Sequence, residues 1–112
     1  MEFRTTDLGD VSMVALVGRL DTQGVGLIET RFTATVVPPA RPTALDLSEV
    51  SFVSSMGLRL LIGTARAMAM RGARLVAFGA QPMVGESLEV AGLGDMVPLF
   101  EDESQALAML RG

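Results

Sequence analysis

The chain of 112 residues is long enough for one domain with a hydrophobic core of its own, and 49% of its residues are hydrophobic. It has no histidine, cysteine or lysine, which excludes a Ser-His-Asp triad, a Schiff-base or Walker lysine and the usual transition-metal ligands, so we expect neither enzymatic activity nor a metal or cofactor. The net charge of −4 argues against nucleic-acid binding, and because no apolar run approaches the ~18 residues of a membrane span, we expect a soluble cytoplasmic protein.

Two strands open the predicted fold. Apolar residues gather in Met1–Phe3 and Val11–Val17, and the segment Asp7–Asp10 between them has the composition of a turn. The second strand shows little polar alternation, which is typical of a strand covered on both faces. The segment Gly18–Asp21 is expected to break this strand.

A helix is predicted next, over about Val25–Ala34, with Asp21 or Thr22 as its N-cap. The segment Pro38–Pro42 contains three prolines and is therefore predicted to be a loop. The helix has three large apolar residues at a spacing that places them on one face, which we expect to be buried: Leu27, Ile28 and Phe32.

The centre of the chain is predicted to run from a short apolar strand, Thr43–Leu47, through a serine-rich turn into a long helix, Ser55–Arg71, that Gly72 ends. The first N–H groups of a helix lack intrahelical partners, so a serine at this junction lies where an added negative charge such as a phosphoryl group is favoured. The expected buried stripe of the helix is Leu58, Leu61, Ile62, Ala65 and Ala69.

The last third of the chain repeats the alternation of strands and helices. Strands are predicted at Arg74–Phe78 and Met96–Leu99, and helices at Gln81–Val90 and from Asp102 to Leu110. Asp102 and Gln105 have the spacing of a capping box, with Asp in place of Ser or Thr, so Asp102 is the predicted cap of the last helix. Strands that alternate with helices indicate an α/β domain with a mixed, largely parallel sheet, here of four to five strands with about four helices.

Two short motifs suggest enzymes or nucleotide-binding proteins but are incomplete. Gly24-Val25-Gly26 resembles the start of a dinucleotide-binding loop, yet the third glycine position is Glu29, whose charge does not suit a pyrophosphate. Ser55-Met56-Gly57 matches half of a nucleophile elbow, yet Val53 replaces its first glycine and no histidine exists to activate the serine. We therefore interpret these glycines as turn residues.

Several segments, in order along nearly the whole chain, resemble the signature of the STAS domains, the family of bacterial anti-sigma factor antagonists. Gly18–Asp21 is similar to the early "G-x-L-D" turn of the family, and Asp46–Val53 to its "D-L-x-x-V-x-F-(V/I/M)" segment, which covers the end of a strand and the exit from it. Gly57-Leu58 is similar to the "G-L" that starts the long helix, and Gly92–Asp95 with Met96–Phe100 to the "G-L … F" stretch before the last helix. The resemblance implies a single STAS-type domain over residues 1–112.

The resemblance implies a regulatory binding protein without enzymatic activity. Such a domain sequesters an anti-sigma factor, which is often also an ATP-dependent serine kinase; phosphorylation of the antagonist breaks the complex and a phosphatase restores it. A phosphoryl group adds ~1.5 to 2 negative charges to a packed interface, which is costly to desolvate. The residues that the resemblance places at the partner interface are Asp21, Thr22, Ser54, Ser55, Met56, Gly57 and Leu58.

The family sequence before "G-L" is usually Asp-Ser-Ser or Asp-Ser-Thr, and its last residue accepts the phosphate. This chain has Ser54-Ser55-Met56 at those positions, so Met56 stands where the usual acceptor is. Ser55 matches the middle serine, which is the acceptor in some relatives, and is our candidate here, with Ser54 second. Either serine can also cap the long helix, and Met56 can pack inward or contact a partner.

Two other functions are compatible with the sequence. STAS-like domains also serve as subunits of membrane transporters or larger signalling complexes without phosphorylation, in which case the partner would be a transporter ATPase. Some relatives bind nucleotides, although this chain has neither a lysine nor a glycine-rich phosphate loop for that purpose.

Overall fold

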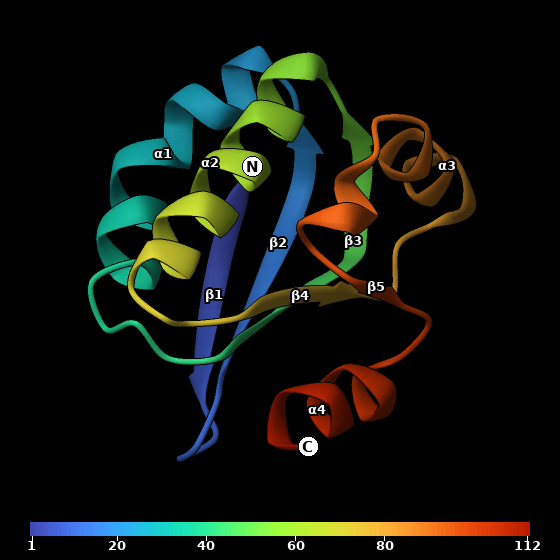
Figure 1. Cartoon of the computed structure of the whole chain (residues 1–112). Coiled ribbons are helices and arrows are strands. Elements are labelled where there is room, and N and C mark those ends of the chain that lie inside the picture. Colours follow the sequence, from blue (N-terminus) through green and yellow to red (C-terminus); the bar gives the residue numbers. More distant parts are fainter.

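A five-stranded sheet forms the centre of the molecule. The computed structural model describes residues 1–112, and the strands lie side by side in chain order, β1-β2-β3-β4-β5 (Figure 1). The first strand runs antiparallel to the second, and the other neighbours are parallel. The predicted mixed, largely parallel sheet is confirmed. The strands are β1 Glu2–Asp7, β2 Ser12–Leu20, β3 Thr43–Val53, β4 Leu75–Phe78 and β5 Leu99–Phe100.

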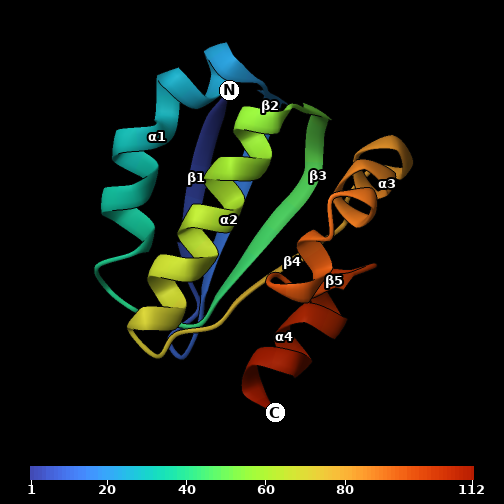
Figure 2. The same ribbon diagram turned by 45° about the horizontal axis from the view of Figure 1, so that its top comes forward.

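Helices lie on both faces of this sheet. The helices α1 and α2 lie next to each other over β1–β3, α3 lies beside β3, and α4 lies below β4 and β5 (Figures 1 and 2). None of these helices combines the length and the apolar character needed to cross a bilayer. The helices are α1 Thr22–Val36, α2 Ser55–Met70, α3 Pro82–Val90 and α4 Glu103–Arg111, with one turn of 3-10 helix at Leu93–Asp95.

Alternate residues of the central strands enter two separate hydrophobic clusters. In β3, Leu45 belongs to a cluster of 23 buried residues that also includes Ile28 and Phe32 of α1. Its neighbour Ala44 belongs to a cluster of four beneath α4. Since successive side chains of a strand point to opposite faces, the large cluster lies under α1, α2 and α3 and the small one under α4.

One predicted strand break is wrong. The second strand does not end at Gly18 but runs through to Leu20. Gly18 has a φ of +113°, and the register between β2 and β3 shifts next to it. A glycine absorbs this irregularity without ending the pairing, because it lacks the Cβ that makes a positive φ unfavourable.

The third strand is much longer than predicted. It extends past Leu47 to Val53, and β2 accompanies it as far as Leu20. On its other side β4 pairs with it only as far as Asp46. Beyond that point the α3 side of β3 has no neighbouring strand, and the Gln81 side-chain amide donates a hydrogen bond to the Ser48 carbonyl there, over 3.0 Å.

The predicted buried faces of the two long helices are partly wrong. Leu27 is 61% exposed, although Ile28 and Phe32 of the same helix are buried as predicted. In α2, Ala69 is exposed and the buried face is turned toward Leu60, Thr64 and Met68. The Thr64 hydroxyl is accommodated because it donates to the Leu60 carbonyl over 2.8 Å.

The C-terminal region differs from its prediction in one strand. The last strand is Leu99–Phe100 and not Met96–Leu99, because the chain first makes the 3-10 turn after Gly92. The predicted cap of the last helix is confirmed, since the Asp102 carboxylate accepts the Gln105 N–H over 2.9 Å.

Candidate functional site

The predicted site residues lie together at the edge of the sheet where β2 and β3 end and α1 and α2 begin. The last residue of β2, Leu20, joins the two helix starts: the Ser54 N–H donates to the Leu20 carbonyl over 3.0 Å, and the Ser54 hydroxyl lies 3.4 Å from the same oxygen. Asp21 follows Leu20 directly and caps α1. Asp21 and Ser54, which are 33 positions apart in the sequence, thus begin two neighbouring helices.

The start of α1 carries a negative charge. The Asp21 carboxylate accepts the Gly24 N–H over 2.8 Å and the Arg19 Nε–H over 3.2 Å. The hydrogen bond from the Gly24 N–H is the main reason why the pKa of Asp21 lies below its usual value, and Arg19 lowers that pKa further. Of the two predicted N-cap candidates, Asp21 and Thr22, the cap is Asp21, and the helix begins at Thr22, three residues before the predicted start at about Val25.

The start of α2 has the same geometry with a neutral cap. The Ser54 hydroxyl accepts the Gly57 N–H over 3.3 Å, and the Ser54 carbonyl accepts the Leu58 N–H over 2.9 Å. Ser54 is half-buried, and capping engages its hydroxyl. Ser55, the first residue of α2, is exposed and its hydroxyl makes no hydrogen bond within the chain, while Met56 beside it is 37% exposed.

A glycine three residues after each cap lets each helix start pack against the end of β2. A Cβ on Gly24 would lie 2.1 Å from the Arg19 carbonyl oxygen, and one on Gly57 would lie 2.3 Å from the Leu20 carbonyl oxygen. Only glycine permits so close an approach without movement of the backbone. Gly57 is therefore buried and positions the turn, whereas Thr22, Ser55 and Met56 face solvent.

An aromatic and cationic pair that the sequence did not indicate completes this edge. The Arg19 guanidinium lies 4.4 Å from the centre of the Phe52 ring, and Phe52 remains 42% exposed. The two residues are register partners only because the pairing of β2 with β3 shifts just before them. No pattern in the sequence indicated this shift, so the pair could not be predicted.

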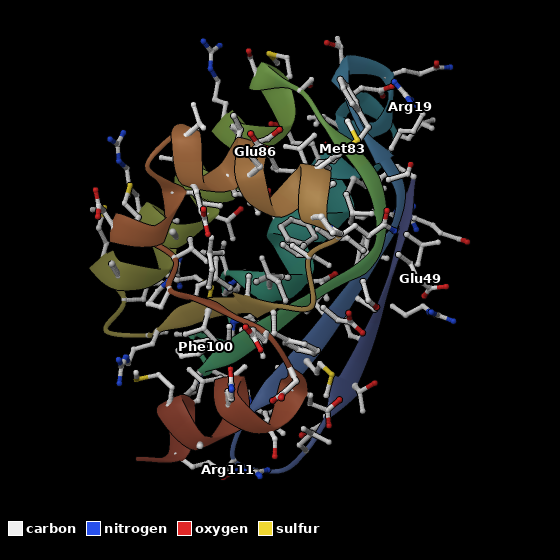
Figure 3. All side chains as sticks on the ribbon, turned by 90° about the vertical axis from the view of Figure 1, so that its right-hand side faces the viewer. Arg19, Glu49, Met83, Glu86, Phe100 and Arg111 are labelled. Atoms are coloured by element: carbon white, nitrogen blue, oxygen red, sulfur yellow. The ribbon has the colours of Figure 1, made fainter.

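An open groove runs beside the start of α2, with α3 as its second wall. Figure 3 shows Met83 and Glu86 on α3, with Arg19 beyond them at the sheet edge. Three residues of the predicted site line the groove, namely Ser54, Ser55 and Leu58, but its α3 wall was not predicted as part of the site. The groove is lined by Phe52, Val53, Ser54, Ser55, Leu58, Met83, Glu86, Ser87, Val90 and Ala91.

A smaller polar cavity lies at the opposite end of the sheet, between β1 and the loop that precedes β3. Its one cation, Arg41, binds the Asp7 carboxylate over 2.8 Å and also donates to the Gly9 carbonyl. The hydrogen bond from Arg41 lowers the pKa of Asp7 to about 2. This guanidinium is already paired, so the cavity offers no free charge to a ligand.

Sequence comparison relates the chain to a known family over almost its whole length. The STAS domain family model matches residues 2–106. The anti-sigma-B factor antagonist of Staphylococcus aureus (strain NCTC 8325 / PS 47) is 28% identical over 101 residues, which are 90% of this chain and 94% of that protein.

Solved structures show the same fold. An anti-sigma factor antagonist from Mycobacterium paratuberculosis superposes with a TM-score of 0.84 at 26% identity, over 99% of this chain and 94% of the other. The anti-sigma factor antagonist SpoIIAA in its unphosphorylated form superposes with a TM-score of 0.77 at 20% identity, over 99% and 97% of the two chains. The phosphorylated form of the Bacillus protein SpoIIAA gives a TM-score of 0.71 over 98% and 100%.

Proposed function

Because this chain belongs to the STAS domain family, we propose that it is an anti-sigma factor antagonist that binds a kinase-type anti-sigma factor through the edge formed by the starts of α1 and α2. The observation that carries the proposal is the exposure of Ser55 and Met56. These two residues lie between Ser54, which caps α2, and Gly57, which packs against the end of β2. Names of similar proteins, including the Staphylococcus aureus antagonist, support the general function. The identity of the partner as a kinase is our extension.

The proposal assigns Ser55 as the phosphate acceptor. Its hydroxyl is exposed and unbonded, whereas the hydroxyl of Ser54 caps the helix and lies 3.4 Å from the Leu20 carbonyl. A phosphate on Ser55 would lie at the N-terminus of α2, where partial positive charge favours it, and would bring a hydrated dianion into the partner interface. Phosphorylation would therefore leave the fold intact and release the partner.

Partner contact is assigned to the solvent-accessible residues around this serine. Thr22 and Met56 are exposed, and Asp21 and Leu58 are half-buried; all four lie at the two helix starts. Met56 has the flexible, polarisable side chain that adapts to a partner surface. Since no hydroxyl stands at position 56, regulation in this chain depends on Ser55 alone.

The test combines mass measurement with binding. The chain is incubated with the anti-sigma factor kinase of its own organism and ATP, and intact mass is recorded for the native chain, Ser55→Ala and Ser54→Ala. We expect one phosphate on the native chain and on Ser54→Ala, and none on Ser55→Ala. Phosphate on Ser55→Ala, or on none of the three, would overturn the assignment of Ser55.

Binding is measured separately by isothermal titration calorimetry. We expect Ser55→Glu to weaken binding at least tenfold, and Ser55→Gln, which has nearly the same size without the charge, to bind within about threefold of the native chain. Failure of the native chain to bind any anti-sigma factor, with recovery of a transporter ATPase in its place, would overturn the proposal in favour of a transporter subunit.

A further inference from the structure

We propose that the groove between the start of α2 and α3 binds a basic amphipathic helix of the partner, with apolar side chains against both walls and a lysine or arginine at Glu86. The inference rests on the proposed function, because it names the part of the partner that this surface recognises. It adds α3, which was not predicted as part of the site, to the interface.

The α3 wall of the groove is apolar and exposed. Met83 and Val90 are 82% and 83% exposed, and their separation of seven residues places them on the same side of the helix. That side is turned away from Val84 and Leu88, which are buried in the core. Exposed large apolar side chains that line up with the period of a helix are typical of a surface that another element covers.

The facing wall is also apolar. It is built from the end of β3 and the first turn of α2, where Phe52 is 42% exposed and Leu58 is half-buried. Arg19 packs on the ring of Phe52, which orients the ring beside the groove. Both walls together offer a slot into which apolar side chains of one inserted element can pack.

The charge of this region selects a basic occupant. Glu86 lies on α3 between Met83 and Val90 and lines the groove. Of the ten residues that line the groove, Glu86 alone carries a formal charge, and Arg19 lies outside the lining, against the ring of Phe52. A basic segment would be attracted here and an acidic one repelled.

The shape of the groove favours a helix over an extended strand. An added strand would have to pair with the free edge of β3, where the Gln81 side chain already donates to the Ser48 carbonyl. The nine residues of α3 span about 13 Å, which corresponds to two to three turns of a helix laid alongside. The occupant therefore needs apolar residues about seven positions apart, with a cation between them.

The position of Ser55 connects this groove to the proposed switch. Ser55 lines the same groove as Leu58 and Glu86. A phosphate there would place a hydrated dianion where the apolar side chains of the bound helix pack. Phosphorylation would then expel the helix without any change of fold, because the loss of apolar contact and the desolvation of the phosphate outweigh its attraction to the cation at Glu86.

The probe for this inference is an 18-residue leucine–lysine peptide whose sequence forms an amphipathic helix. It is compared with a scrambled peptide of the same composition and with a leucine–glutamate version. Binding to the intact chain is followed by fluorescence anisotropy, and its site by chemical shifts of the ¹⁵N-labelled chain. We expect the helical basic peptide alone to bind, and to shift residues 52–58 and 83–91.

Matched variants separate the groove from general charge attraction. We expect the double variant Met83→Ser/Val90→Ser to bind the peptide about tenfold more weakly, and Met70→Ser, at an equally exposed methionine outside the groove, to bind as the native chain does. We expect Glu86→Lys to weaken binding about fivefold, and Glu89→Lys, on the same helix but outside the groove, less than twofold.

Equal binding of the scrambled peptide, equal effects of Glu86→Lys and Glu89→Lys, or shifts confined to Glu101–Glu103 would overturn the inference. The same variants are then titrated with the intact anti-sigma factor. If that protein binds the double variant as tightly as the native chain, the groove is not its site although the proposed function stands. If the peptide binds in the groove but the anti-sigma factor does not bind the native chain, the proposed function fails and the groove stands.

Discussion

The starts of α1 and α2 are two versions of one structure with different charges. Each begins with a cap whose side chain accepts the N–H of a glycine three residues later, and each glycine packs on a carbonyl at the end of β2. In α1 the cap is Asp21, whose carboxylate supplies a negative charge. In α2 the cap is Ser54, which is neutral, and an exposed serine follows it.

This difference separates a fixed helix start from one that can be modified. The positive end of the α1 dipole is already compensated by Asp21, whose carboxylate also accepts a hydrogen bond from Arg19. The positive end of the α2 dipole has no such charge, so an anion added at Ser55 would supply there what Asp21 supplies to α1. Both helix starts pack against the backbone at the end of β2, so their geometry depends on the same strand. Their charges differ, because only α1 has an anionic cap.

The largest expected effect on stability comes from replacing the glycine that packs against β2 at the start of each helix, Gly24 in α1 and Gly57 in α2. Gly24→Ala and Gly57→Ala would each push a methyl group within 2.1 to 2.3 Å of a backbone oxygen, which cannot move as a flexible side chain does. We expect each to lower the free energy of unfolding by about 3 kcal/mol. Urea denaturation measures this loss.

Each helix supplies its own control for that experiment. A Cβ on Gly26 of α1 or Gly63 of α2 would meet nothing within 4 Å. Alanine has a higher helix propensity than glycine, so Gly26→Ala and Gly63→Ala are expected to raise the free energy of unfolding by ~0.5 to 1 kcal/mol. If all four substitutions changed stability alike, the close packing of the two starts on β2 would be disproved.

An intermediate effect is expected from the caps themselves, and pH distinguishes them. Ser54→Ala removes a neutral cap and should cost ~1 kcal/mol at every pH from 7 to 3. Asp21→Asn removes a charge whose pKa is lower in the folded chain than in the unfolded one. The stability that this charge contributes is present above about pH 4, the usual aspartate pKa, and is lost as the pH falls through the folded pKa.

The measurement is the difference in free energy of unfolding between each variant and the native chain, taken along the pH series. Using differences removes the titration of Asp7 and Asp10, whose pKa values are also lowered, by Arg41 and Arg111 respectively. A constant difference for Asp21→Asn down to pH 2 would show that its charge does not stabilise α1.

The sequence permitted a correct prediction of the fold class and of the residues that cap these helices, because caps and apolar periods are local signals. Asp21, Ser54 and Asp102 were all identified as caps or cap candidates from their positions alone, and each accepts the predicted kind of N–H. The spacing of cap and glycine, Asp21 to Gly24 and Ser54 to Gly57, was present in the sequence, although its meaning depends on the end of β2.

The parts that could not be predicted depend on contacts between distant segments. The length of β3 follows from its pairing with β2, which continues to Val53 after β4 has ended at its side. The groove follows from the placement of α3 next to that unpaired stretch, about 30 residues later in the chain. Exposure of Leu27 likewise depends on where α1 rotates to bury Phe32, which its helical period alone does not determine.

The smallest expected effect tests the difference in charge directly, by adding one carboxylate at the first position of each helix. Thr22 and Ser55 are both exposed at that position. Ser55→Asp should raise the free energy of unfolding by about 0.5 kcal/mol at low ionic strength, because α2 has no anion at its start. Thr22→Asp should gain less stability than Ser55→Asp or lose stability, since the new carboxylate adjoins Asp21.

Thermal unfolding at low and high salt measures the stability of both variants, and salt should abolish the gain of Ser55→Asp. Since a carboxylate at position 55 is also expected to weaken partner binding, as proposed for Ser55→Glu, a Ser55→Asp chain that is more stable and binds less would separate the effect on the interface from any effect on folding. Equal gains for the two variants would mean that the Asp21 charge leaves α1 as receptive to an anion as α2, and the contrast between the two helix starts would fail.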